Sequence, residues 1–186
     1  CQHLAFSELV LYRRGSWHYL DEASTIALFD GLRADLEKLS LASYFAEMAE
    51  AVTSEDLPSG EVLSLLLNSL YALDTLDRPN ELVRAAFELR LLAHIANDET
   101  MIAAFRSGED IHAVTASQVF GVPLDEVTPL QRSHAKAVNF GIVYGISAFS
   151  LAQDIGVFQS EAKAYMDSYF AKYHGVRAYM DRIVAQ

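Results

Sequence analysis

The stretch that decides the fold is TPLQRSHAKAVNFGIVYG, residues 128–145. Its first residues form a clear helix start: Thr128 is placed to act as N-cap, Pro129 stands at the first helical position, and Gln131 at the third. We therefore expect a helix to begin at this threonine and to run through the rest of the stretch.

Four side chains of this helix recur at steps of four: Arg132, Lys136, Phe140 and Tyr144. Residues four apart differ by about 40° around a helix axis, so these four form one slowly winding stripe, which we call the cation–aromatic stripe. Its order suits phosphates at the cationic end, where the helix dipole also attracts anions, and a stacked base at the aromatic end. The alternative interpretation is a half-buried surface helix with two solvated cations and two core aromatics.

The composition is that of a globular protein. The chain has 186 residues, 52% of them apolar, which is enough for one substantial core or two small ones. No apolar run reaches the ~20 residues of a membrane span, and no signal peptide is recognisable. The one cysteine, Cys1, excludes an internal disulfide and suits a reducing cytosol. Because the chain begins with this cysteine, we expect it to be a fragment of a longer one.

The net charge of −11 argues against a generic nucleic-acid-binding surface, because phosphate affinity comes from lysine and arginine. No acidic residue lies between Glu126 and Asp154, whereas Arg132 and Lys136 lie inside that window. This is where we expect a phosphate to bind. No metal site is expected, because the histidines lack ligand spacing. They are His3, His18, His94, His112, His134 and His174.

The predicted fold class is mainly α: a helical bundle with a short N-terminal β-hairpin, followed by further helices. The predicted strands are Phe6–Tyr12 and Trp17–Leu20. Apolar spacing and capping residues predict helices from Asp30 to the SEDLPSG segment (54–60), from Glu61 to Leu76, from Glu81 to a stop at Gly108, from the cap Asp110 to Gly121, from Thr128 onward, from Ser147 to Gly156, and from Ser160 to about Ala185.

The pattern Arg-x3-Lys-x3-Phe-Gly-x2-Tyr-Gly is complete here and resembles the fingers helix of family A DNA polymerases. The similarity spans about Glu88 to Gln186, because ELRLLAHIANDE, GEDIHAVTASQVFGVP, GISAFSLAQDIG and YMDSYFAKYHGVRAYM match that family in order and spacing. The resemblance implies polymerase-fingers-like helices over this part of the chain.

The same resemblance implies binding of an incoming deoxynucleoside triphosphate and a DNA template-primer. Arg132, Lys136 and His112 would contact the triphosphate. Phe140 would stack on the sugar and base, and Tyr144 would guard the templating position. The helix would also act as a lid that closes on a correct base pair.

By the same resemblance, Glu88 would hydrogen-bond Tyr144 and block a ribose 2′-hydroxyl.

The family resemblance also identifies which catalytic residues are missing. Family members use Mg²⁺ ions held by carboxylates, the first of them an aspartate five residues before the position of Glu88. Val83 stands at that position, and the second carboxylate motif, HDE, lies downstream of this chain's last residue. We therefore expect no catalytic residues, no metal bound by this chain alone and no polymerase activity.

Residues 4–93 resemble a different family, the bacterial recombination mediator RecO. LAFSELVLYRRGSWHYLDEAS, LRADLEKLSLASYFAEMAEAV, GEVLSLLLNSLYALD and NELVRAAFELRLLA match the end of its oligonucleotide-binding (OB) barrel and its helical domain. The resemblance implies single-strand annealing and contacts with RecR and single-strand-binding protein. A plain helical bundle is the alternative. Residues 1–91 carry 15 acidic side chains against 7 basic ones, which disfavours binding to the acidic tail of the latter partner.

Both resemblances include FELRLLA, Phe87 to Ala93, so we predict a hybrid of two gene pieces joined within one helix. Helix signals are local, and each piece is therefore expected to keep its local structure. The resemblances also imply a bacterial cytoplasmic location. The predicted parts are a remnant of the OB-barrel hairpin (1–22), a RecO-like helical domain (23–90) and a fingers-like helical region (91–186).

Overall fold

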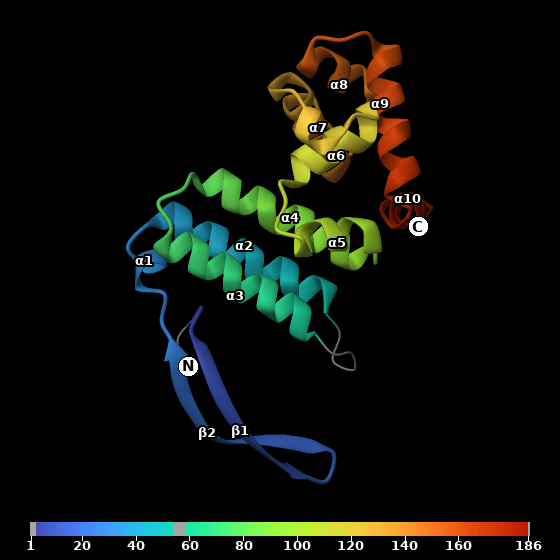
Figure 1. Ribbon diagram of the computed structural model, residues 1–186. Coiled ribbons are helices and arrows are strands. Elements are labelled where there is room, and N and C mark those ends of the chain that lie inside the picture. Colours follow the sequence, from blue (N-terminus) through green and yellow to red (C-terminus); the bar gives the residue numbers. More distant parts are fainter. Residues whose placement is uncertain (1–2, 54–58, 186) are drawn as a thin grey trace. The chain divides into compact units, whose positions relative to one another are not determined.

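The computed structural model describes residues 3–53 and 59–185. Most of them are helical, and the strands among them form one antiparallel hairpin near the N-terminus, which confirms the predicted fold class (Figure 1). The chain divides into two compact units, Cys1–Phe87 and Glu88–Gln186. The boundary lies within helix α4 (Asn80–Ile95). No helix of the described residues is long and apolar enough to cross a bilayer.

The hairpin consists of β1 (Phe6–Arg14) and β2 (Trp17–Ala27). Gly15 lies in the connecting turn with a φ of +68°, which glycine adopts without steric cost. Both strands extend beyond the predicted ends, because acidic residues continue β2 instead of ending it. Glu22 pairs with Val10, and its side chain stays solvated since nearly all of β2 is exposed. The origin of this hairpin in an OB barrel stays a prediction.

The first unit continues with α1 (Asp30–Arg33), α2 (Leu36–Val52) and α3 (Gly60–Thr75). The prediction of one helix from Asp30 is wrong. The carboxylate of Asp35 accepts hydrogen bonds from the backbone N–H groups of Glu37 (2.9 Å) and Lys38 (3.1 Å), so it caps a new helix there. The predicted stop in SEDLPSG falls largely on residues 54–58, outside the described residues.

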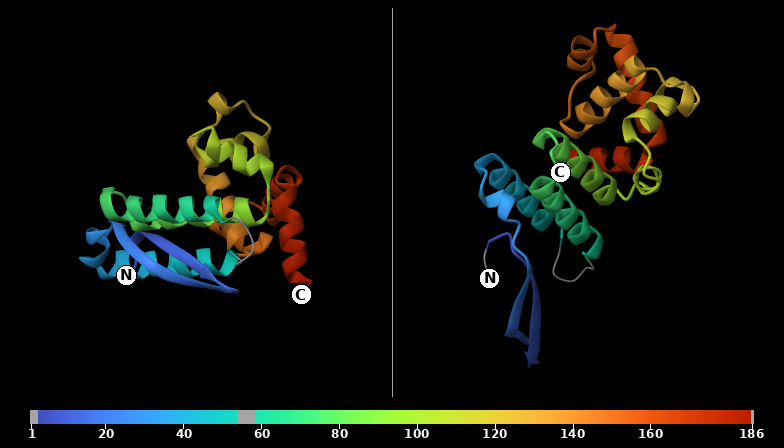
Figure 2. Two further views of the ribbon diagram at one scale, coloured as in Figure 1. Left: turned by 90° about the horizontal axis from the view of Figure 1, so that it is seen from below. Right: turned by 60° about the vertical axis from the view of Figure 1, so that its left-hand side comes forward.

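Helices α2 and α3 lie side by side and enclose the core of the first unit (Figures 1 and 2). Its centre is a stacked pair of buried rings, Phe45 and Phe87, whose centroids lie 4.2 Å apart. The apolar spacing within α3 predicts a buried face made of Leu63, Leu66, Leu67, Leu70 and Leu73. Leu70 and Leu73 are buried, but Leu63 is 47% exposed and Val62 is buried instead. The apolar face of α3 is thus rotated slightly from the predicted one.

The predicted helix from Glu81 to Gly108 is interrupted, and that prediction is wrong. Asn80 stands just before Glu81, where the sequence predicts an N-cap, but helix α4 already includes it. The helix ends at Ile95. Asn97 then takes a φ of +48°, a conformation that asparagine tolerates better than most residues. Helix α5 (Glu99–Arg106) begins after the N-cap Asp98.

Asp98 joins two helices that are far apart in sequence. It is 3% exposed, and its Oδ1 accepts a hydrogen bond from the Met101 backbone N–H of α5 at 2.9 Å. Its Oδ2 accepts from the N–H groups of Gly175 (2.8 Å) and Val176 (3.3 Å) in the first turn of α10 (His174–Val184). A Cβ on Gly175 would lie 2.7 Å from the Ala96 carbonyl oxygen, so glycine permits this close approach.

The other helices of the second unit begin and end mostly where capping residues predict. Asp110, Thr128 and Ser147 are N-caps, and Gly121 and Gly156 are left-handed C-caps. The single helix predicted from Ser160 to Ala185 is wrong, because the backbone leaves the helical conformation at Tyr173. The elements before α10 are α6 (Ile111–Phe120), the short 3₁₀ helix η1 (Leu124–Glu126), α7 (Pro129–Val143), α8 (Ala148–Ile155) and α9 (Gln159–Lys172).

The second unit has its own core, built by α4 to α10. Helix α7 packs on α6, α8 and α9 at its centre. The buried apolar residues of this core are Leu89, Leu92, Ala93, Met101, Val138, Ile142, Leu151, Ala152, Ala162, Tyr169, Tyr173 and Val176.

We predict that Asp98→Ala destabilises the second unit by about 3–5 kcal/mol, because it leaves buried N–H groups of two helices without acceptors. Asp98→Asn retains one acceptor oxygen and should cost less. Urea unfolding followed by circular dichroism measures both. The control is Glu99→Ala, an exposed neighbour for which a change under about 1 kcal/mol is expected. Equal stability of Asp98→Ala and Glu99→Ala would contradict this role of Asp98.

Candidate functional site

The cation–aromatic stripe starts at a well-formed helix N-terminus. The Gln131 N–H donates to Thr128 Oγ1 at 3.2 Å, and Gln131 Oε1 accepts from the Thr128 N–H at 2.9 Å, which completes the predicted capping box. Further along, Lys136 Nζ lies 5.8 Å from the centre of the Phe140 ring. Both side chains are half-buried. The first three members of the stripe therefore lie on α7 with a cation beside the aromatic face.

Tyr144 differs from the expectation, because it is the C-cap of α7 instead of a helical residue. Gly145 follows with a φ of +67° and ends the helix. The chain then folds back so that the Ile146 side chain lies against Gly141, leaving no space for a Cβ there. The two glycines of the FGIVYG segment thus end helix α7 directly after the stripe and let the chain turn back there.

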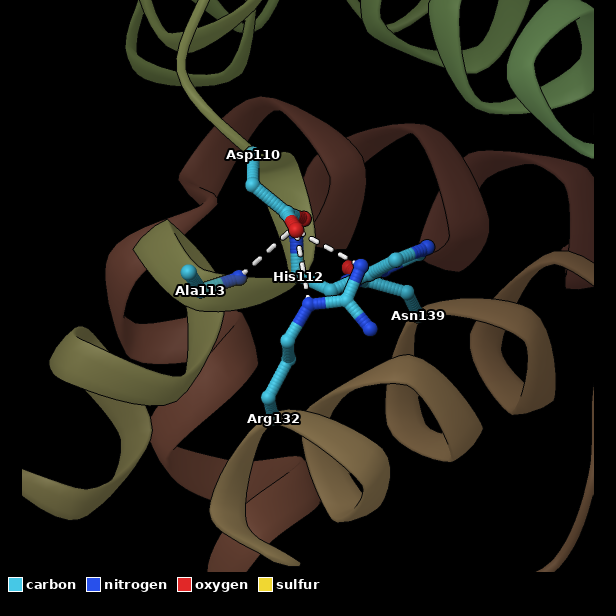
Figure 3. A network of polar contacts seen from close by, with 5 residues as sticks. All are labelled: Asp110, His112, Ala113, Arg132 and Asn139. Atoms are coloured by element: carbon cyan, nitrogen blue, oxygen red, sulfur yellow. Dashed lines mark hydrogen bonds and ion pairs between the residues drawn. The ribbon is translucent and has the colours of Figure 1, made fainter. Parts of the chain in front are cut away.

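Arg132 does not stand free in an acid-free window. Its Nε donates to Asp110 Oδ2 at 2.6 Å, and Nη2 of the same guanidinium lies 2.6 Å from that oxygen (Figure 3). The other oxygen, Asp110 Oδ1, caps α6 by accepting from the N–H groups of His112 (2.9 Å) and Ala113 (3.4 Å). The window without acids in the sequence is therefore not free of acids in space, because the N-cap residue of α6 pairs with this cation.

The charge of Asp110 is stabilised by these contacts. Partial burial acts to raise its pKa, but the hydrogen bond from Arg132, the N–H groups of the α6 cap and the nearby guanidinium charge together hold the pKa below its usual value. At neutral pH the carboxylate is ionised and offsets part of the positive charge at this end of the stripe. A phosphate that approaches Arg132 meets this competing anion.

His112 lies next to the aromatic face of the stripe and within electrostatic reach of both cations. Its ring centroid is 5.6 Å from that of Phe140. The pKa of His112 is lowered to about 4, mainly by burial. The charges of Arg132 and Lys136 also act to lower this pKa, and the charge of Asp110 acts to raise it. The imidazole is therefore neutral at physiological pH and can act as a hydrogen-bond donor or acceptor but not as a third cation.

A chain of buried polar groups stands behind His112. Asn139 is fully buried on α7, and its Nδ2 lies 3.0 Å from His112 Nδ1 and 3.2 Å from Thr115 Oγ1. The Thr115 hydroxyl in turn lies 3.2 Å from the Tyr173 hydroxyl. Burial raises the pKa of Tyr173, although its hydrogen bond with Thr115 acts in the opposite direction. This neutral chain connects α6, α7 and the junction of α9 with α10.

Glu88 and Tyr144 lie at the other end of the stripe. The Tyr144 hydroxyl donates to Glu88 Oε2 at 2.7 Å, across 56 residues of sequence. Glu88 is buried, whereas the Tyr144 side chain is 58% exposed. The structure thus places all six expected site residues in the second unit: Glu88 on α4, His112 on α6, three on α7, and Tyr144 at the C-cap of α7.

The residues do not fit the Mg²⁺ pair of the resembled family. Val83 is buried on α4 and has no oxygen that could ligate a hard cation. Within residues 3–53 and 59–185, no three His, Cys, Asp or Glu side chains are grouped so that they could hold a metal. We therefore derive no metal-dependent step for this chain.

The sequence interpretation missed three contributions to the site. They are Asn139, Thr115, and the pairing of Asp110 with Arg132. Asp110 was identified only as a helix cap, because its contact with Arg132 spans 22 residues. Asn139 carried a usable signal, since it is a polar residue on the apolar face of a predicted helix. A buried amide must find partners, and that requirement points to another polar group nearby.

We predict that His112 stays neutral from about pH 8 down to pH 5, because its folded pKa is about 4. The unfolded imidazole titrates at about pH 6.5, so the unfolded state binds the proton first as the pH falls. The free energy of unfolding therefore decreases as the pH falls from about 6.5 to about 4, and His112 contributes no pH dependence above that range. An NMR titration of the His112 ring, assigned with His112→Gln, checks this. A midpoint near ~6.5 in the folded chain would contradict it.

Comparison with known proteins confirms both resemblances. The sequence model of DNA polymerase family A matches residues 85–186, and that of the recombination protein O C terminal matches residues 33–95. DNA polymerase I of Pseudomonas aeruginosa is 57% identical over 99 residues, which are 53% of this chain and 11% of that protein. DNA polymerase I of Geobacillus stearothermophilus is 50% identical over 112 residues, 58% of this chain and 13% of that protein.

A solved structure is similar in fold to about half of the chain. The POL domain of Pol1 from M. smegmatis, in complex with DNA primer-template and dNTP, superposes with a TM-score of 0.50 at 45% sequence identity. The match covers 53% of this chain and 18% of that one. The chain spans about a tenth of the length of the curated relatives that it matches. Because the sequence model of the family covers more than half of its residues, the chain belongs to DNA polymerase family A.

Proposed function

We propose that the second unit binds a deoxynucleoside triphosphate along the cation–aromatic stripe. The observation that carries the proposal is the convergence on Phe140: Lys136 Nζ lies 5.8 Å from the centre of its ring, and the ring of His112 5.6 Å from it. A phosphate chain held by Arg132, Lys136 and His112 would therefore leave the sugar and base next to an aromatic face.

The other end of the stripe suits the template and the sugar. The exposed Tyr144 ring offers a stacking surface for a template base, and its hydrogen bond to Glu88 fixes the hydroxyl. The buried carboxylate of Glu88 would exclude a ribose 2′-hydroxyl. The structural relative contains DNA primer-template and dNTP, which supports these partners for this chain. Movement of α7 as a lid belongs to the same proposal.

We propose binding without polymerisation. Phosphoryl transfer in the family depends on carboxylate-held Mg²⁺, and Val83 cannot take the part of the first carboxylate. The second carboxylate motif of the family, HDE, does not occur in these 186 residues. The chain would therefore hold a nucleotide without adding it to a primer.

A second candidate function comes from the match of residues 33–95 to the recombination protein O C terminal. The first unit could serve as a RecO-like interaction module that contacts RecR or single-strand-binding protein and supports strand annealing. The 15 acidic residues among the first 91 weigh against the acidic tail of the latter as ligand. Retention of purified RecR by the immobilised chain, lost above physiological salt, would favour this candidate.

The two matched regions overlap at residues 85–95, inside α4. We propose that the chain joins a RecO-derived piece, covering residues 1–22 and 23–90, to a fingers piece covering 91–186. The unit boundary between Phe87 and Glu88 supports a junction in this helix. Bacterial polymerase relatives support a cytoplasmic location.

We predict that Lys136→Ala weakens triphosphate binding about tenfold, because a charge-assisted contact is worth about 1.5–3 kcal/mol. Fluorescence anisotropy of a labelled deoxynucleoside triphosphate measures the affinity, which should also fall as salt rises. The matched control is Lys163→Ala, an exposed lysine of α9 that pairs with Asp167 and should leave the affinity unchanged. Equal affinities of Lys136→Ala and the parent chain would overturn the proposed site.

We predict that Asp110→Asn raises the triphosphate affinity roughly threefold, because it removes the anion that competes for Arg132. Asparagine is as good an N-cap as aspartate, so α6 keeps its start. Asp154→Asn, which removes an exposed acid from α8, controls for net charge. A lower affinity for Asp110→Asn would instead show that the carboxylate positions the guanidinium for phosphate.

A further inference from the structure

The imidazole of His112 has two different surroundings. Its Nδ1 faces the buried amide of Asn139 at 3.0 Å. Its Nε2 makes no hydrogen bond within the described part of the chain. Three buried side-chain atoms in that part lack a partner, Ser7 Oγ, Gln118 Oε1 and Tyr169 OH, and Nε2 is not one of them. Nε2 therefore retains access to solvent.

The atom that Asn139 presents decides which nitrogen of His112 carries the proton. An amide NH₂ only donates, so Nδ2 opposite Nδ1 requires Nδ1 to accept, and the single proton of the neutral ring then resides on Nε2. Thr115 Oγ1 lies 3.2 Å from the same Nδ2 and 3.3 Å from Oδ1 of Asn139. Both ends of the amide thus have a partner in the buried chain, and the amide is held without access to water.

The protonation state matters because of the charges around the ring. Asp110 caps the helix that carries His112, and Arg132 and Lys136 face it from α7. A ring protonated on Nδ1 would turn the lone pair of Nε2 toward the phosphates and repel them. A ring protonated on Nε2 donates a hydrogen bond there without adding a third positive charge beside Arg132 and Lys136.

We propose that Asn139 is a positioning residue that locks His112 in the Nε2–H tautomer, so that a neutral imidazole donates a hydrogen bond to a phosphate oxygen of the bound nucleotide. This inference rests on the proposed triphosphate site and adds to it the residue that sets the polarity of one of its donors.

The tautomer can be measured directly in the nucleotide-free chain. Long-range ¹H–¹⁵N correlation spectra distinguish a protonated from an unprotonated ring nitrogen, and His112→Gln assigns the signal. The expected result is one predominant tautomer with the proton on Nε2. A predominant Nδ1–H signal, or a mixture of both forms, in the parent chain overturns the inference, and this result does not depend on the folding of any variant.

Asn139→Asp tests the cause. It keeps the shape of the side chain but presents only acceptors to Nδ1, so the proton should move to that nitrogen and the ring should titrate at higher pH. Triphosphate affinity should fall about tenfold. If the aspartate variant does not fold, Asn139→Ser tests the same role, because it removes the amide without adding a charge. This variant should give a mixture of the two tautomers of His112. Variants that fold and retain the Nε2–H signal of the parent overturn the role of Asn139.

Failure of this inference and failure of the proposed site are distinguishable. If Lys136-dependent binding of the triphosphate is found while His112 carries its proton on Nδ1, the site stands and the inference falls. If the Nε2–H tautomer is found in a chain that binds no triphosphate at millimolar concentration, the proposed site falls and the phosphate contact of His112 falls with it.

Discussion

The buried hydrogen bonds of Asn139 fix helix α7 against helix α6, and the direction of the cation–aromatic stripe depends on them. The amide is fully buried, and its partners Thr115 and His112 both belong to α6. A rotation of α7 about its axis would leave this amide without partners inside the core, at a cost of about 1–3 kcal/mol for each lost contact. Apolar packing alone tolerates such rotations better, since it has no direction.

Two carboxylates extend this fixed arrangement to the rest of the second unit. Asp98 caps α5 and also receives two N–H groups from the start of α10, so one buried side chain sets the positions of two helix ends. Asp110 caps α6 with one oxygen and holds Arg132 with the other. In a chain with a net charge of −11, two acids, Asp110 and Glu88, lie at the stripe. Each accepts a hydrogen bond from a member of the stripe, Asp110 from Arg132 and Glu88 from Tyr144.

Local signals predicted much of this structure. The starts at Asp110 and Thr128 and the stop at Gly121 were predictable because a cap is decided by residues within one helical turn. The breaks at Asp35 and Asp98 were missed because the apolar spacing continues through them and masks the capping residue. The contacts of Asp110 with Arg132 and of Asn139 with His112 span 22 and 27 residues, and no periodicity encodes such pairs. Spacing alone singled out Arg132, Lys136, Phe140 and Tyr144, whereas His112 and Glu88 came from the family resemblance.

We propose that the start of α7 and the start of α6 together form a site for a deoxynucleoside triphosphate. Chemical-shift mapping of the ¹⁵N-labelled chain during titration with one deoxynucleoside triphosphate tests it most directly. We expect the largest changes at the Arg132 guanidinium, the His112 ring and the backbone around Lys136, with residues 3–53 unaffected. Saturable changes confined to the first unit, or none near α7 at millimolar nucleotide, would contradict it.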